Sequence, residues 1–414
     1  MLQTPPEESS VVRKDFFIIF VLLFNALTWW YITPIIVEDL LIALDVTESQ
    51  TILIWTSYFA AIVASSIVGS ILSTKIKRLS LLYAWIVSGM GISLLPALLS
   101  NSSAIHVMVV SVLFGVLFGL GMPSCLAFFA DWTQVGNRGR IGGIVLLVTN
   151  LSAPLFAILF GMFDLVTSSV ILAVWRGSGL LVFFLKPDAR AEEKLVSDRK
   201  EIPSFATILQ NRSFVLYFVA WLLFCLVDRF ETPIQRGFLG DDYESLLMFG
   251  PILGSISAFV GGLLSDRIGR KRVLLYGFVS LGIAYAIIGI ADYFFLAVPL
   301  MVWYLSFGVI SVSAGFIWVL LILVLWGDLS QSGAREKYYA IGTIPFFLTN
   351  IIQLFSAEHV TLHPESAFSL AAFFLFLAVL PLLYAPETLP EKKIELRRLR
   401  KYFDGAKKIS EKYT

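Results

Sequence analysis

The sequence predicts an all-α membrane protein of twelve transmembrane helices, arranged as two six-helix bundles with both termini on the cytoplasmic side. Three observations lead to this prediction. The chain is 57% hydrophobic and only 15% charged, with a mean hydropathy of +0.83. It contains twelve apolar stretches that are long enough to cross a bilayer, and three short motifs of its first half recur in its second half. Such a composition indicates that lipid is the solvent for much of the surface.

The twelve apolar stretches are each roughly 20 residues or longer, which is the length a helix needs to span the hydrocarbon core. Continuous apolar runs favour helices over the alternating strands of a membrane barrel, because a helix satisfies its own backbone groups. Little more than Asp164 separates the fifth stretch from the sixth, so this boundary is the least defined. The stretches cover residues 16–40, 51–72, 79–99, 105–129, 141–163, 165–185, 213–235, 245–264, 273–293, 298–326, 339–357 and 367–384.

The positive charges predict the orientation. If the amino terminus is cytoplasmic, the inner segments contain 28 of the 31 Lys and Arg residues. Of the other three, Arg176 and Arg229 lie within expected helices, and Arg236 alone lies outside them. Cytoplasmic loops collect Lys and Arg because positively charged loops resist translocation. The sequence therefore predicts a multi-pass protein with cytoplasmic termini, and we expect it in the plasma membrane.

The sequence offers little support for an enzyme. Cys125 and Cys225 both fall inside expected helices, with no metal-ligand spacing, and the three histidines lie near outer helix ends. No phosphate-binding loop is present. We therefore expect no metal, no cofactor and no nucleic-acid partner, and we expect the protein to act as a monomer.

Three motifs at the expected inner face recur in order, with a nearly constant spacing. Residues 69–80 match 261–272 at a spacing of 192, residues 131–140 match 328–337 at 197, and Pro187-Asp188 matches Pro386-Glu387 at 199. Such a repeat is typical of transporters built from two parallel halves. It predicts an amino-terminal half at 1–185, a cytoplasmic linker at 186–212, a carboxy-terminal half at 213–390 and a basic tail at 391–414.

This pattern resembles the major facilitator superfamily. Residues 262–272 read Gly-x-Leu-x-Asp-Arg-x-Gly-Arg-Lys-Arg between the eighth and ninth helices, and the likeness covers residues 15–390. The Pro386-Glu387-Thr388 ending is similar to the sugar-porter and organic-ion branches. The resemblance implies alternating access, with the first, fourth, seventh and tenth helices lining a central cavity.

The 261–272 loop predicts a cytoplasmic gate. Gly262 permits close approach of helices, and Asp266 can accept hydrogen bonds from Arg270 or from a neighbouring helix end. Thr74 replaces this acid in the amino-terminal copy, so we expect a weaker latch there. Four further charged residues either take part in hydrogen-bond networks at the inner face or are solvated loop charges; they are Asp131, Arg138, Asp328 and Arg335. The gate candidates are Gly262, Asp266, Arg267, Gly269, Arg270, Asp131, Arg138, Asp328 and Arg335.

The seventh helix carries three ionisable residues within its apolar run. Charges inside a membrane are costly, so they usually pair with one another or face water. Asp228 and Glu231 are three residues apart and share a helix face, whereas Arg229 points about 100° away. Asp228 and Glu231 are therefore candidates for binding a coupling proton or cation, and Arg229 for holding an anionic group. An internal salt-bridge cluster near the outer surface remains an equal alternative.

Other polar or amphipathic side chains in the expected helices are candidates for solute contact. Each of them more often connects helices or lies at a membrane interface. Arg176, isolated in the sixth helix, is expected to have a structural partner or to extend to the inner face. The remaining solute candidates are Asn25, Trp29, Trp30, Asn150, Asn350 and Gln353.

The residues and the resemblance together favour a secondary transporter for a small organic solute, either an organic anion or a sugar-like metabolite. We expect proton-coupled symport. The alternatives are a membrane sensor or scaffold on a transporter fold, and a proton-driven exporter. Substrate identity resides in a few cavity side chains and is not decided by the fold.

Overall fold

The computed structural model describes residues 13–99, 103–185, 202–294, 299–331, 333–356 and 364–390. The basic tail at 391–414 and the first part of the linker, to residue 201, lie outside these described residues. Within them the chain is helical and contains no strand. The helices are α1 (Arg13–Ala43), α2 (Glu48–Leu72), α3 (Arg78–Ser93), η1 (Leu95–Leu98), α4 (Ala104–Trp132), α5 (Arg138–Gly161), α6 (Leu165–Ser178), α7 (Leu181–Phe184), α9 (Phe205–Gln210), α10 (Arg212–Leu239), α11 (Asp241–Ile268), α12 (Arg270–Phe294), α13 (Leu300–Trp318), η2 (Val319–Val324), α14 (Leu325–Leu329), α15 (Arg335–Ser356) and α16 (Pro364–Tyr384).

Twelve helical segments in the described part of the chain are long and apolar enough to cross a membrane, which confirms the predicted number. The boundary between the fifth and sixth spans also falls where the sequence places it. The fifth span ends at Gly161, and Leu165 begins the sixth directly after Asp164.

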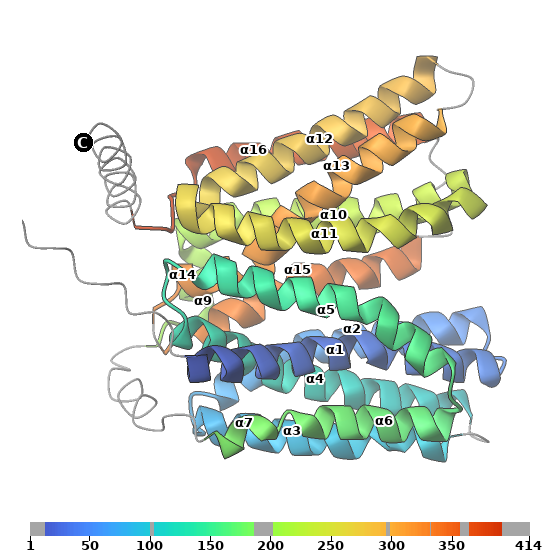
Figure 1. Ribbon diagram of the computed structural model, residues 1–414, viewed down its shortest axis with the longest axis vertical. Helices are drawn as coiled ribbons and strands as arrows, with labels where there is room; N and C mark the ends of the chain where they lie inside the picture. The colour runs from blue at the N-terminus through green and yellow to red at the C-terminus, as the bar shows by residue number, and fades with distance from the viewer. Residues whose placement is uncertain are drawn as a thin grey trace, which may run out of the picture.

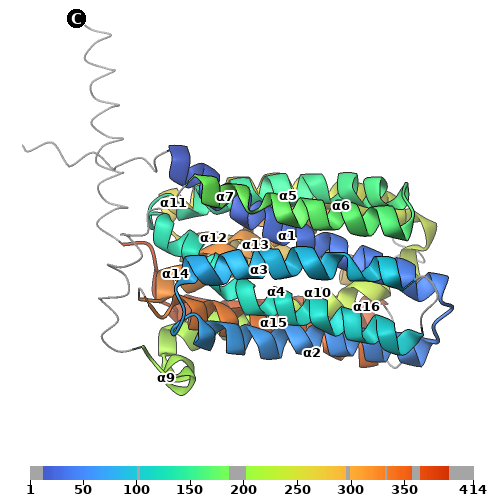
Figure 2. The ribbon, with the colours of Figure 1, turned by 90° about the horizontal axis from the view of Figure 1, so that it is seen from below.

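The helices form two bundles that lie side by side (Figures 1 and 2). The segments α1 to α7 make up one bundle, and α10 to α16 make up the other. Helix α5 packs along α11 from the opposite bundle, and α2 packs in the same way along α15. These two helix pairs are the main seams between the halves, so any movement of one half against the other must change them.

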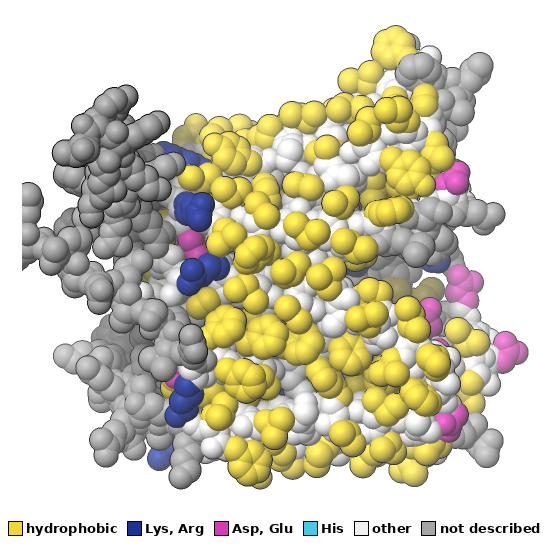
Figure 3. All heavy atoms as spheres, viewed as in Figure 1, with side chains coloured by type: hydrophobic (Ala, Val, Ile, Leu, Met, Phe, Trp, Pro, Cys, Tyr) yellow, Lys and Arg dark blue, Asp and Glu magenta, His cyan; other side chains and the backbone are white. Residues whose placement is uncertain are grey.

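The surface shows how the bundles fit a membrane (Figure 3). Apolar side chains cover the flank, while Lys and Arg gather at one end and most visible Asp and Glu at the other. We call these the basic end and the acidic end. Exposed side chains on the flank include Leu155, Ile158 and Phe373, which are 58 to 68% exposed. Large apolar groups in such number belong in lipid rather than in water.

Glycines allow the backbones of α5 and α11 to touch at the basic end. A Cβ atom on Gly262 would lie 2.1 Å from the carbonyl oxygen of Gly139, and one on Gly143 would lie 2.8 Å from the Cα of Phe259. Gly139 and Gly143 are four residues apart, which is the spacing that lets membrane helices approach closely. The seam therefore depends on small residues from both halves.

The tenth span is not a regular helix. Between α13 and α14 the chain forms a π-helical segment, η2, whose residues are almost all buried. Extra residues in a π-turn leave carbonyl groups without their usual partners. The hydroxyl of Tyr339 donates to the carbonyl of Leu323, and the indole of Trp326 donates to that of Leu321. Side chains thus stabilise a local irregularity near the basic end of this span.

We predict that replacing Gly262 with Leu separates the halves at the basic end. The new side chain would meet the backbone of Gly139, which cannot move aside without shifting α5, and such overpacking costs about 1 to 3 kcal/mol. Ser330 is 8% exposed at the basic end. A cysteine at that position should react faster with a membrane-impermeant maleimide in the Gly262→Leu variant than in the parent.

The matched control for this measurement is Gly308→Leu, because a Cβ at Gly308 meets nothing within 4 Å. Equal labelling rates in the Gly262→Leu and Gly308→Leu variants would contradict the account of the seam.

Candidate functional site

Two buried aspartates at the basic end each connect the two halves. Asp131 ends α4 and Asp328 lies in α14, and their side chains are 1% and 0% exposed. The two residues are 197 positions apart and occupy equivalent places in the repeat. Each carboxylate pairs with one arginine from its own half and one arginine from the other half. The four arginines also match in pairs across the repeat.

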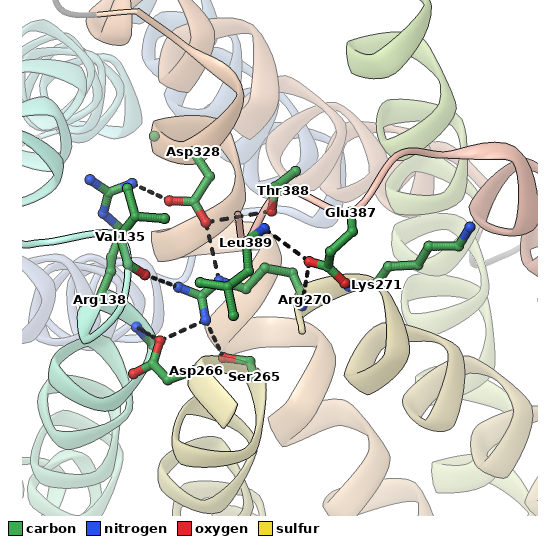
Figure 4. A network of polar contacts seen from close by, with 12 residues as sticks. Val135, Arg138, Ser265, Asp266, Arg270, Lys271, Asp328, Glu387, Thr388 and Leu389 are labelled. Atoms are coloured by element: carbon green, nitrogen blue, oxygen red, sulfur yellow. Dashed lines mark hydrogen bonds and ion pairs between the residues drawn. The ribbon is translucent and has the colours of Figure 1, made fainter. Parts of the chain in front are cut away.

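In the carboxy-terminal cluster, Asp328 pairs with Arg270 of its own half, with Nε 3.1 Å from Oδ2, and with Arg138 of the other half (Figure 4). Arg270 is fully buried and also bonds to Asp266, with Nη1 2.6 Å from Oδ1. A third bond joins Arg270 to the carbonyl of Val135 at 2.6 Å, again across the halves. One guanidinium thus connects three segments of the chain.

Asp266 also accepts two backbone hydrogen bonds from the first turn of α5. The amides of Gly139 and Arg140 lie 3.0 and 2.7 Å from its two carboxylate oxygens. The first amides of a helix have no partner within the helix, and a carboxylate there is further stabilised by the helix dipole. Asp266 therefore contacts both of the partners that the sequence suggested, namely Arg270 and a neighbouring helix end.

The amino-terminal cluster differs from the sequence expectation of a weaker latch. Asp131 pairs with Arg78, its Oδ2 2.6 Å from Nη1, and with Arg335 of the other half. Thr74 replaces the acid of Asp266 and bonds to its own helix, but Glu336 supplies a second carboxylate to Arg78 from across the seam. Glu336 occupies the repeat position of Gly139. Both clusters thus contain this acid, and in both it comes from the carboxy-terminal half: Asp266 pairs with an arginine of its own half, whereas Glu336 pairs with one from the other half.

The Pro386-Glu387-Thr388 motif holds the start of α12. Glu387 accepts from the amides of Arg270 and Lys271, at 2.8 and 3.2 Å. Gly269 precedes them with φ of +108°, and a Cβ there would lie 2.3 Å from the Glu387 carboxylate. Only glycine fits this backbone conformation without strain.

Arg267 does not join the clusters, which corrects the sequence expectation. Its side chain is exposed at the basic end, because it follows Asp266 by one residue and so points to another side of α11. Arg78, Glu336 and Glu387 take part in the network although the sequence analysis did not select them as gate residues. The repeat offered a signal for Arg78, since it matches Arg270 at the spacing of 192.

We predict that Glu336→Gln and Asp266→Asn destabilise the protein to a similar extent. Each change leaves a buried arginine short of one carboxylate, and breaking a buried pair costs about 3 to 5 kcal/mol. The melting temperature of the detergent-solubilised protein measures this effect, and Glu38→Gln at an exposed position of α1 is the control. A large drop in melting temperature for Asp266→Asn with none for Glu336→Gln would contradict this account. It would support the weaker amino-terminal latch that the sequence predicts.

The three ionisable residues of α10 lie in the second half of that helix. Arg229 Nη2 is 3.2 Å from Asp228 Oδ2, and these side chains are 24% and 29% exposed. Glu231 is 7% exposed and accepts from the amide of Gln235, one turn further along. Asp228 is about 24 Å along the helix from Arg212, at 1.5 Å per residue. The group has two carboxylates and one guanidinium, so its own charges do not fully neutralise one another.

Arg229 lies against aromatic side chains that come from both halves. Its guanidinium carbon is 4.9 Å from the ring centre of Phe346. Phe346 contacts Trp30 of the other half and Trp318 of its own, with ring centres 5.7 and 5.3 Å apart. We call these rings the aromatic platform; it comprises Trp30, Phe118, Trp318, Phe346 and Phe347, which are joined by further ring contacts of 5.0 to 6.2 Å. Of these rings, the sequence indicated only Trp30 as a candidate for solute contact.

Asn150 and Asn350, near this platform, each use part of their hydrogen-bonding capacity within the protein. The hydroxyl of Tyr31 donates to the Asn150 side chain at 3.1 Å, joining α1 to α5. Asn350 donates to the carbonyl of Phe346 in its own helix at 2.6 Å. Gln353 is half-buried one turn beyond Asn350.

Asn25 and Trp29 lie inside the amino-terminal bundle, which corrects their selection as solute contacts. Asn25 accepts from Arg176 Nη1 at 2.7 Å, and the Arg176 guanidinium carbon lies 4.6 and 4.0 Å from the ring centres of Trp29 and Trp85. Arg176 is fully buried. Asn25 and Trp29 point toward Arg176, because a buried cation is stabilised by a hydrogen-bond acceptor and by aromatic faces. This confirms that Arg176 has structural partners.

We predict that Asn25→Leu lowers the melting temperature, because it removes a hydrogen bond to a buried charge that contributes about 1.5 to 3 kcal/mol. Asn150→Leu, which removes a contact to a neutral hydroxyl, should have the smaller effect. If Asn25→Leu instead kept the melting temperature and abolished solute transport, Asn25 would be a solute contact after all.

Within the described residues, no group of three His, Cys, Asp or Glu side chains is placed to hold a metal ion. The two cysteines are buried and free.

Comparison with known families identifies the class of the protein. Residues 18–234 match the model of the major facilitator superfamily, and residues 244–398 match that of the sugar (and other) transporter family. The first match covers more than half of the chain, so the protein belongs to the major facilitator superfamily. This confirms the resemblance in the sequence and the prediction that the chain is a transporter and not an enzyme.

Solved structures show the same fold. One is the proton:xylose symporter XylE bound to 6-bromo-6-deoxy-D-glucose, with a TM-score of 0.72 and 15% identity, covering 92% of this chain and 97% of that one. Another is the human organic anion transporter MFSD10, with a TM-score of 0.66 and 14% identity, covering 92% and 100%. No curated protein sequence matches significantly. The chain is thus an integral membrane transporter with the two-bundle architecture of this superfamily.

Proposed function

We propose that the protein is a proton-coupled symporter that moves a small organic solute by alternating access, as a monomer in the plasma membrane. The observation that carries this proposal is the pair of repeated clusters at the basic end. Asp131 and Asp328 each bond to both halves, so they hold this end together only while the halves are in contact. The boundaries predicted for the two halves, the linker and the tail belong to the same proposal.

In the proposed cycle the two clusters act as the cytoplasmic gate. Their arginines and acids are in contact when the basic end is closed, and they must separate when the halves rock apart. Packed interfaces of this kind have discrete arrangements rather than a continuous range. The solute enters from the acidic end in one arrangement and leaves at the basic end in the other, which assumes the cytoplasmic orientation that the positive charges predict.

The α10 group supplies the proposed coupling site. Asp228 and Glu231 are carboxylates within a membrane span, and such residues mark proton pathways in transporters. Arg229 neutralises Asp228 and is positioned to hold an anionic group of the solute. When an anion occupies Arg229, Asp228 loses its partner, and a proton bound from the acidic side removes the cost of the unpaired charge.

Two other functions use the same architecture. A sensor or scaffold would bind a solute without cycling, and a proton-driven exporter would cycle in the opposite direction. Proteoliposomes separate these functions, because a symporter accumulates solute when the outside is more acidic, a proton-driven exporter when the inside is more acidic, and a sensor under neither condition. The absence of counterflow and of gradient-dependent uptake across a broad solute panel would contradict the proposal and favour the sensor.

We predict that Asp228→Asn abolishes proton-driven accumulation but preserves solute exchange. The amide keeps the shape of the site but cannot carry a proton across the membrane, and Glu231→Gln should act in the same way. Accumulation and exchange measured in the same proteoliposomes test this, with Glu38→Gln as the control. Full accumulation by both variants would exclude these carboxylates from coupling.

A further inference from the structure

Between the halves, the guanidinium of Arg229 lies against a set of aromatic rings. Trp30, Trp318 and Phe346 are half-buried although each contacts other rings of the platform, whereas Phe118 and Phe347 are buried. Trp30 comes from the amino-terminal half and Phe346 from the other, so these partly open rings meet at the seam. Figure 3 shows the surface hollowed between the halves toward the acidic end.

Arg229 lies directly beside this platform. Its guanidinium is over the ring of Phe346, and its Nε has no hydrogen-bond partner among the described residues. Its one ion pair is with the neighbouring Asp228, at 3.2 Å. A guanidinium with free donors binds a planar carboxylate with two parallel bonds. An anionic group held by Arg229 would therefore place the rest of a ligand against Phe346 and Trp30.

We propose that the solute is an organic anion with a flat apolar body, whose charged group binds Arg229 and whose body stacks on the aromatic platform. This inference rests on the proposed transport function and names the substrate class for the same site. Trp30 and Phe346 then determine specificity, because they provide a stacking surface from each half. A ligand in this position contacts both halves at once.

A sugar fits this site less well. Every hydroxyl that leaves water needs a hydrogen-bond partner in the protein, or binding loses free energy. Near the platform, the hydroxyl of Tyr31 already donates to Asn150 and Asn350 already donates to its own helix, so part of the polar capacity is used within the protein. Aromatic rings satisfy a flat apolar body without any such partners.

The geometry also sets a competition at Arg229. Asp228 and the anionic group of the solute bind the same guanidinium, so the carboxylate of Asp228 weakens anion binding by its own charge. Removal of that charge should therefore strengthen binding, although the same change abolishes coupling. A purely structural role for the Asp228–Arg229 pair predicts no such gain.

Equilibrium dialysis of radiolabelled 2-naphthoate against the purified full chain in nanodiscs tests the proposal without transport. We expect saturable binding that unlabelled 2-naphthoate displaces. Acetate lacks the flat apolar body, and 2-naphthalenemethanol lacks the negative charge. Each should compete at least about tenfold less well than 2-naphthoate, because acetate loses the stacking contact and the alcohol loses the charged one. D-xylose should not compete.

Variants assign the two contacts. Arg229→Gln should weaken 2-naphthoate binding about ten- to hundredfold, the range for a charged hydrogen bond, while Arg236→Gln, an exposed arginine on the same helix, should leave it unchanged. Trp30→Ala should weaken binding about tenfold, with partial recovery in Trp30→Phe. Asp228→Asn should tighten it, which misfolding cannot cause.

Absence of saturable 2-naphthoate binding, displacement by D-xylose, or unchanged binding in Arg229→Gln would each overturn the substrate class. A protein that binds 2-naphthoate with the expected pattern but never accumulates it against a gradient contradicts the proposed transport function alone. The two failures are therefore distinguishable.

Discussion

The structure depends on two buried aspartates that bond to both halves at once. Asp131 and Asp328 are almost fully inaccessible, and an isolated carboxylate in such a place would be strongly unfavourable. Each is acceptable only because two arginines surround it, one from each bundle. These charges can therefore be buried only while the two halves are in contact. The same ion pairs hold the basic end closed.

Backbone contact and charge pairing reinforce each other at this seam. Gly139 and Gly262 bring α5 and α11 together until their backbones touch, and this places the first amides of α5 within reach of Asp266. A bulkier residue at either glycine would hold the helices apart and leave Asp266 without those donors. The glycines and the acid thus act as one unit, and opening this end must break both kinds of contact together.

Sequence reasoning recovered the parts of this architecture that follow from local chemistry. Helix number, the repeat and the contacts of Asp266 follow from hydrophobic length, from recurring motifs and from the rule that buried acids need donors. It did not recover Glu336, because the acid that compensates for Thr74 comes from the opposite half and from another helix. A single sequence does not show that an acid missing from one helix is supplied by a distant helix.

The sites between helices were harder to predict for the same reason. The sequence made Asn25 a candidate for solute contact, but in the structure it accepts a hydrogen bond from Arg176. The sequence around a single arginine does not show which helix supplies its hydrogen-bond acceptor. The sequence indicated Trp30 but not the rest of the aromatic platform, because phenylalanines such as Phe346 are typical residues of any apolar helix. Their shared position became visible only when the two halves were seen together.

The distance between the halves at the basic end tests the central claim most directly. Lys75 and Arg267 are exposed, occupy equivalent repeat positions and belong to opposite halves, so spin labels at both sites report this distance by pulsed electron paramagnetic resonance. The account predicts one dominant short distance in the parent protein, and a substantial longer population when Asp131→Asn and Asp328→Asn are combined. An unchanged distance distribution in that double variant would contradict the claim that these two aspartates hold the halves together.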